Sequence, residues 1–134
     1  MKILLISCIF TSVIFLIIDI LWLSYMVKHF YRPNLGSLLT DKPVMWAAIL
    51  FYLVYVVGLA IIILHPAIVK DSISMAFWTG IVFGLVSYGT YNLTNMATVN
   101  NWSANVVFVD MIWGGFLTGT SSALGIYLTK KLIF

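Results

Sequence analysis

Charged residues are scarce in this sequence, and glutamate is absent. Lys, Arg, Asp and Glu together make up 8% of the 134 residues, whereas 63% of the residues are hydrophobic. A soluble domain carries about 25% charged residues, so this chain cannot cover itself with a water-exposed surface. The scarcity of charge therefore excludes an ordinary soluble protein and predicts an all-α integral membrane protein.

Cysteine and histidine are also scarce. Cys8 is the single cysteine, which excludes an intramolecular disulfide and a Cys-rich metal site. His29 and His65 follow different apolar segments at opposite faces, so they cannot share a metal ion within one subunit. The chain contains no glycine-rich phosphate loop and no His–Glu metal motif. We therefore expect no metal and no cofactor. The net charge of +3, spread over termini and loops, gives no indication of nucleic-acid binding.

Four long apolar segments alternate with short polar loops. Each segment is close to the length of about 20 apolar residues that crosses a bilayer. The first segment is too long for the core of a signal peptide, so we expect it to remain as a span. The pattern predicts one membrane domain, residues 1–134, built as a four-transmembrane-helix bundle with short loops. The expected spans are about residues 3–26, 44–64, 74–93 and 105–128.

Helix-breaking residues set the expected ends of these spans. Pro33 and Gly36 should end helical structure after the first span, with Tyr31 at the membrane interface. Pro66 should end the second span. Residues 92–103 are polar without a single charge, so we expect them to form the connection between the third and fourth spans.

Four spans place both termini on one side of the membrane. That side carries four lysines, and the opposite side carries three basic residues. Basic residues are enriched in cytoplasmic loops. The distribution therefore favours cytoplasmic termini.

Two aspartates lie within the apolar spans. Asp19 lies about 13 Å along a helix from Lys28, and Asp110 about 10 Å from Ser103, at about 1.5 Å per residue. Both distances start from the face opposite the termini, so the two acids should share one half of the bilayer. A carboxylate there costs about 2.5–3.5 kcal/mol, and no Lys or Arg lies within a span. We expect both acids to face the protein interior, and at least one to hold a proton near neutral pH.

Polar and aromatic residues gather around these acids. Each acid is followed three residues later by a tryptophan, which places each pair on one helical face. Nearby asparagines fit either a pocket or the cap of a helix, and the tryptophans fit either a cation site or an interfacial belt. No residue is assigned a catalytic role. The candidate ligand- or proton-binding residues are Asp19, Trp22, Tyr88, Tyr91, Asn92, Asn95, Trp102, Asp110 and Trp113.

The arrangement of these residues resembles a family of small bacterial membrane proteins, domain of unknown function 2177. The resemblance covers nearly the whole chain. It rests on Asp19 with Trp22, on the run Tyr91-x-Leu-Thr-Asn-x-Ala-Thr98, on Trp102, and on Asp110-x-x-Trp-Gly114. The resemblance implies a four-span inner-membrane protein and implies no activity. The family more often has Asp at the position of Asn92, so this chain would lack one acid of the cluster.

Three classes of function fit these observations. A small transporter, or a protein that binds a small ligand, cation or proton, would use the two acids as binding groups. Four spans hardly enclose a path, so a transporter would need a homo-oligomer in the lipid bilayer. An intramembrane enzyme acting on a lipid-like substrate could use the carboxyls as acid and base, although we expect a non-enzymatic role. An accessory subunit would use the cluster only for folding.

Structure can separate these classes. A water-accessible cavity that touches both acids would favour binding or transport. An apolar groove open sideways to lipid would favour a lipid-like substrate. A filled core would favour the accessory subunit.

Overall fold

The computed structural model describes residues 1–133 and contains four long helical segments. The structure is 89% helical, and the described residues form no strand. Each of the four segments is long and apolar enough to cross a membrane, which confirms the predicted all-α membrane fold. The segments are Lys2–Leu38, Met45–Val69, Ile73–Thr98 and Ala104–Ile133.

Changes of helix type divide the first two segments. The first segment comprises α1 (Lys2–Met26), a π-helical turn (Val27–Tyr31), α2 (Arg32–Leu35) and a 3₁₀ turn (Gly36–Leu38). The second comprises α3 (Met45–Leu59), a π-helical turn (Ala60–Leu64) and α4 (His65–Val69). The third and fourth segments are α5 (Ile73–Thr98) and α6 (Ala104–Ile133).

The helices continue past both prolines at which we expected them to end. Pro33 lies within α2 and Pro66 within α4. A proline ring lacks an N–H and clashes with the carbonyl four residues earlier. Here that carbonyl belongs in each case to a π-helical turn, whose wider bonding pattern accommodates the ring. The predicted helix ends at the two prolines were therefore wrong, and the first segment continues to Leu38.

The third helix also runs further than expected. Helix α5 continues to Thr98, so residues 92–98 of the predicted connection are helical and that part of the prediction was wrong. Within this stretch, the Thr94 and Thr98 hydroxyls donate to backbone carbonyls four residues earlier, at 2.5 and 2.8 Å. Such bonds satisfy polar side chains inside a helix. The true connection is residues 99–103, where Asn101 takes a positive φ of 62°.

Glycines bring the backbones of α5 and α6 into contact. A Cβ atom added at Gly84 would lie 2.0 Å from the carbonyl oxygen of Gly114. A Cβ atom at Gly125 of α6 would lie 2.0 Å from Oγ1 of Thr11 in α1. Small residues allow membrane helices to approach closely. Helix α6 is therefore the central element, packed against both α5 and α1.

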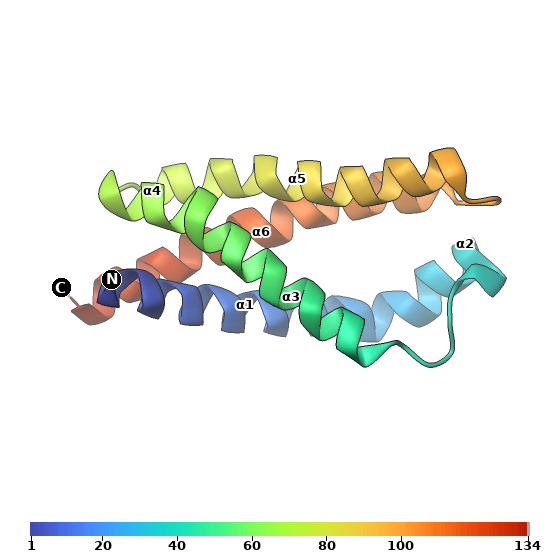
Figure 1. Cartoon of the computed structure of the whole chain (residues 1–134), viewed down its shortest axis with the longest axis horizontal. Coiled ribbons are helices and arrows are strands. Elements are labelled where there is room, and N and C mark those ends of the chain that lie inside the picture. The colour runs from blue at the N-terminus through green and yellow to red at the C-terminus, as the bar shows by residue number, and fades with distance from the viewer. Residues whose placement is uncertain (134) are drawn as a thin grey trace.

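Helix α3 runs at a slant to α1, α5 and α6, and its start lies far from α5 (Figure 1). Both termini lie at one end of the bundle (Figure 1). Leu59, Ile63 and Leu64, in the later half of the second segment, are buried, whereas residues 45–54 contain no buried side chain. The beginning of α3 therefore diverges from α5 and leaves one side of the bundle open, at the end away from the termini.

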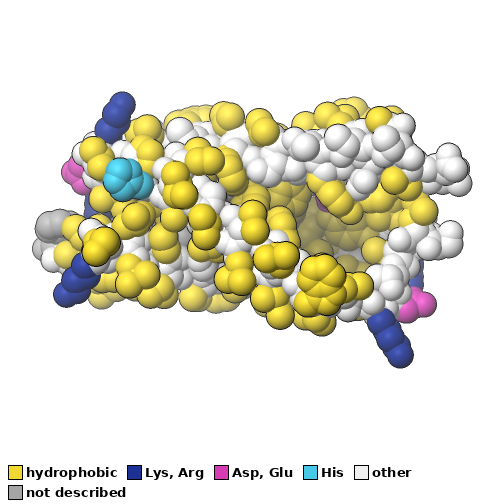
Figure 2. Space-filling model, viewed as in Figure 1, with side chains coloured by type: hydrophobic (Ala, Val, Ile, Leu, Met, Phe, Trp, Pro, Cys, Tyr) yellow, Lys and Arg dark blue, Asp and Glu magenta, His cyan; other side chains and the backbone are white. Residues whose placement is uncertain are grey.

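The outer surface of the bundle is apolar along its length. Many large hydrophobic side chains are exposed, including Ile61, Val82 and Phe108. The charged side chains visible in Figure 2 lie at the two ends of the molecule. This distribution fits a lipid bilayer around the middle of the bundle.

Candidate functional site

A cavity of about 470 Å³ occupies the half of the bundle away from the termini. Its lining comprises nine aromatic and five aliphatic side chains together with Asp19, Ser87 and Asp110. Figure 2 shows it as a hollow in the side of the bundle. Because its walls include residues of α3 and α5, the hollow opens where the start of α3 diverges from α5. The cavity thus faces the apolar surroundings of the bundle.

Asp19 reaches the cavity from a buried stripe on α1. Ser7, Thr11, Phe15 and Asp19 follow one another at four-residue intervals, and all are buried. Asp19 is 5% exposed. Its Oδ2 accepts a hydrogen bond from the Tyr52 hydroxyl at 2.6 Å, and its Oδ1 accepts one from Trp113 Nε1 at 3.3 Å. The acid on α1 is therefore held from both α3 and α6.

Asp110 reaches the same cavity from α6 and is 8% exposed. Its Oδ1 accepts a short hydrogen bond from the Tyr31 hydroxyl. Its Oδ2 accepts a hydrogen bond from Nδ2 of Asn92 at 3.1 Å. Nδ2 of Asn92 also donates to the Tyr88 carbonyl at 3.0 Å, which fixes the orientation of the amide. This second acid is held from the end of the first segment and from α5.

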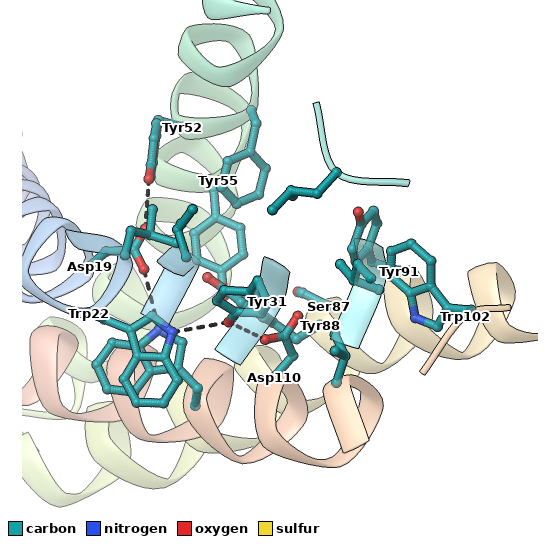
Figure 3. A pocket seen from close by; sticks show the side chains of 17 residues that line it. Asp19, Trp22, Tyr31, Tyr52, Tyr55, Ser87, Tyr88, Tyr91, Trp102 and Asp110 are labelled. Atoms are coloured by element: carbon teal, nitrogen blue, oxygen red, sulfur yellow. Dashed lines mark hydrogen bonds between the residues drawn. The ribbon is translucent and has the colours of Figure 1, made fainter. Parts of the chain in front are cut away.

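The two tryptophans support the acids in a crossed arrangement. The rings of Trp22 and Trp113 stack with centroids 3.9 Å apart and planes within 9°. Trp113, on the helix of Asp110, donates to Asp19. Trp22, on the helix of Asp19, donates from Nε1 to the Tyr31 hydroxyl at 3.0 Å, and Tyr31 in turn donates to Asp110 (Figure 3). Stacking and hydrogen bonds therefore join both acids into one network.

The structure brings together eight of the nine residues that the sequence singled out. Asn92 does not line the cavity but bonds to Asp110. Asn95 is half-buried and lies outside the lining. That these residues bind a ligand stays a prediction. The seven that line the cavity are Asp19, Trp22, Tyr88, Tyr91, Trp102, Asp110 and Trp113.

Sequence reasoning missed four polar residues of the lining. Tyr31 was expected at the interface, yet its hydroxyl bridges Trp22 and Asp110. The signal was the four-residue spacing of Asp19, Leu23, Val27, Tyr31 and Leu35, all of which line the cavity. That spacing was hidden by the assumption that the helix ends before Pro33. The other three missed residues are Tyr52, Tyr55 and Ser87.

The lining contains two acids and no Lys, Arg or His. Within residues 1–133, two ion pairs occur, Arg32–Asp41 at 2.7 Å and Lys130–Asp71 at 2.5 Å, and neither lines the cavity. The hydrogen-bond donors to the cavity acids are all neutral: two tyrosines, one tryptophan and one asparagine. The cavity can therefore hold an apolar group against its aromatic and aliphatic walls. The two carboxyls and their neutral hydrogen-bond donors provide the polar part of the wall.

The protein family follows from comparison with known proteins. A family model described as "Predicted membrane protein (DUF2177)" matches residues 4–127. The chain belongs to the DUF2177 family. This confirms the resemblance read from the sequence, and the match to DUF2177 includes every residue that lines the cavity. No curated protein and no solved structure matched this DUF2177 chain.

Proposed function

We propose that this DUF2177 protein binds a small amphipathic molecule that enters from the surrounding lipid. The observation that carries the proposal is the cavity itself, which has both intramembrane acids in its wall and an opening on the side of the bundle. Ligand sites are typically concave, of about 300–1,000 Å³, with mostly apolar walls and a few placed polar groups. A volume of about 470 Å³ falls within that range.

The packing of the other half favours binding over a continuous transport path. Toward the termini, Phe15, Leu117 and Ile126 are buried in the core. There the Ser7 hydroxyl donates to Oγ1 of Thr129 at 3.0 Å and closes the contact between α1 and α6. The cavity therefore ends inside the bundle. Transport would require this packed half to open within the homo-oligomer that the sequence suggested, whereas binding requires no change.

An enzyme acting on a lipid-like substrate is the second candidate, because the sideways opening is the feature such a substrate would need. The one serine in the cavity lining, Ser87, is the candidate nucleophile. Its hydroxyl donates to the Phe83 carbonyl at 2.8 Å, and no histidine lies beside it in the lining. A serine without an adjacent base is a weak nucleophile. Acid–base chemistry by the two carboxyls would first require the same binding step, so binding is the function to test first.

The proposed location is the bacterial inner membrane, with both termini in the cytoplasm. The lysine distribution supports this orientation, and it would place the cavity in the outer half of the bilayer. Reporter fusions at the C-terminus that are active only in the cytoplasm or only in the periplasm test the orientation. Activity of the periplasmic reporter alone would contradict it.

Tryptophan fluorescence offers a direct test of binding. The chain has five tryptophans: Trp22, Trp102 and Trp113 line the cavity, whereas Trp46 and Trp78 are 71% and 62% exposed on the outside. Replacing the two outer residues by Phe leaves emission from the cavity alone. In phosphatidylcholine nanodiscs, alkyl chains that carry a terminal bromine should quench this emission saturably. The chains would bear an alcohol, an amine or a carboxylate head.

A matched pair of substitutions on α5 separates the cavity from the lipid. Ser87 lines the cavity, whereas Thr90 faces outward, and each hydroxyl bonds to the carbonyl four residues earlier. Ser87→Phe should fill part of the cavity and weaken saturable quenching at least tenfold, while Thr90→Phe should leave it unchanged. If no probe quenches the emission saturably, or if quenching is equal in Ser87→Phe and Thr90→Phe, the proposal is refuted.

A further inference from the structure

The cavity carries two acidic side chains and no basic one. Asp19 and Asp110 come from different helices, and both belong to the lining, which contains no basic side chain. The two ion pairs among the described residues lie outside the lining. An anionic head group placed here would meet two acids, and a neutral head group would leave them without a counter-charge.

The hydrogen bonds around the acids leave room for further donors. Each of the four carboxyl oxygens accepts one hydrogen bond from a neutral side chain. An ionised carboxylate offers about four acceptor positions on its two oxygens. Because all four bonds run toward the carboxyls, both groups act only as acceptors. A ligand with several N–H donors would use the remaining positions.

A further buried acceptor lies next to Asp110. Asn92 is 0% exposed, and its Oδ1 has no hydrogen-bond partner among the described residues. Turning the amide over would not relieve this, because Nδ2 already serves two acceptors, Asp110 and the Tyr88 carbonyl. A buried acceptor without a donor is costly. Nε1 of Trp102, in the cavity lining, is likewise buried without a partner among the described residues, so this part of the bundle has no basic side chain and leaves one acceptor and one donor free for a ligand.

The aromatic lining favours a cation for an independent reason. The faces of tryptophan and tyrosine rings attract cations, most strongly when water is excluded. Tyr91 and Trp102 meet edge to face with centroids 5.7 Å apart, and Tyr88 lies one helical turn before Tyr91. These rings line the cavity together with Asp110. An ammonium group near that acid would thus also be close to aromatic side chains.

We infer that the ligand is an amphipathic amine, with a protonated amino group at Asp19 and Asp110 and an apolar body toward the opening between α3 and α5. This inference rests on the proposed function and deepens it by naming the head group. A primary amine with an alkyl chain supplies the positive charge and three N–H donors, and its chain fits the aromatic and aliphatic walls. It remains protonated at neutral pH, as the lysine side chain does.

The three brominated probes test this inference in the protein that retains only the cavity tryptophans. The amine, the alcohol and the carboxylate share one chain, so differences in quenching midpoint report the head group. Charge-assisted hydrogen bonds are roughly twice as strong as neutral ones. The amine should therefore bind at least about tenfold more tightly than the alcohol, and the carboxylate should bind most weakly.

Substitution of the acids tests which groups recognise the amine. Asp19→Asn and Asp110→Asn should each reduce the amine's advantage over the alcohol about tenfold. Asp71→Asn, at the end nearest the termini and outside the lining, should leave that advantage unchanged. Retained binding of the alcohol shows that a variant is folded. If a variant does not fold, the comparison of the three probes on the protein that retains Asp19 and Asp110 still tests the inference.

The outcomes separate this inference from the proposed function. An alcohol or carboxylate that binds as tightly as the amine, with quenching lost in Ser87→Phe, overturns the inference and leaves the cavity as a binding site. Quenching that is insensitive to Ser87→Phe for every probe overturns both.

Discussion

The two halves of the bundle use opposite kinds of side chain. Near the termini, small residues such as Ser7, Thr11 and Gly125 bring helix backbones together. At the other end, large rings such as Trp22 and Trp113 stack on each other and stand around a cavity. In a membrane, where lipid is as apolar as the core, close packing and polar bonds hold helices together. The first half depends mainly on packing, and the second depends on a hydrogen-bonded network around an open space.

The largest loss of stability is expected from a substitution that breaks the close contact between α5 and α6. In Gly84→Ala the added methyl group would lie 2.0 Å from a backbone oxygen of Gly114, which cannot move without shifting α6. Overpacking costs about 1–3 kcal/mol and occasionally more, and here we expect the upper end or beyond. Unfolding in detergent, followed by circular dichroism, measures the loss. Equal stability of Gly84→Ala and the wild type would contradict the account.

The matched control lies on the same helix, toward the cavity. In Gly89→Ala the added methyl group would meet only the end of the Met111 side chain, at 3.0 Å. Methionine is flexible and can adjust to small changes in packing. The loss of stability should therefore be much smaller than that of Gly84→Ala.

The next largest loss of stability tests whether hydrogen bonds stabilise the half of the bundle that contains the cavity. Tyr31→Phe removes the hydroxyl that accepts from Trp22 and donates to Asp110. Leaving buried partners unsatisfied costs about 1–3 kcal/mol. Tyr127→Phe, whose side chain is exposed, should cost much less. Titration with a denaturing detergent compares the two variants, and equal stabilities would show that the network contributes nothing.

A smaller effect should come from the stacked tryptophans. Trp22→Phe and Trp113→Phe, made singly and together, form a double-mutant cycle across the two helices. Aromatic pairs contribute about 0.5–1.5 kcal/mol beyond their buried area, and each indole also donates a hydrogen bond within the network. We expect a coupling energy of about 1 kcal/mol from the same unfolding measurement. Purely additive losses would indicate that the rings act independently.

The smallest effect concerns an exposed pair near the mouth of the cavity. Arg32 and Asp41 join α2 to the loop before α3 at 2.7 Å, and both are exposed. Exposed ion pairs contribute about 0–1 kcal/mol and are screened by salt. Arg32→Gln should therefore change the unfolding midpoint only slightly, and any change should vanish at high salt. A large change that persists in salt would assign this pair a structural role that the account does not give it.

Much of the fold could be predicted from the sequence, because apolar length and intramembrane acids are strong signals. The four spans, and the convergence of Asp19 and Asp110, followed from them. The continuation past Pro33 and Pro66 could not be predicted, since it depends on local widening of the helix. The role of Tyr31 could not be predicted either, because it depends on the same continuation past Pro33. The crossed pairing of tryptophans and acids depends on helix rotation, which spacing along one helix does not give.

Anomalous diffraction from crystals grown with the brominated alkylamine in a lipid phase would show directly whether an amine occupies the cavity. A bromine peak is expected in the opening between α3 and α5, with the amino nitrogen within hydrogen-bond distance of Asp19 or Asp110. Bromine found only on the outer surface, with the cavity side chains closed over an empty space, would contradict this expectation.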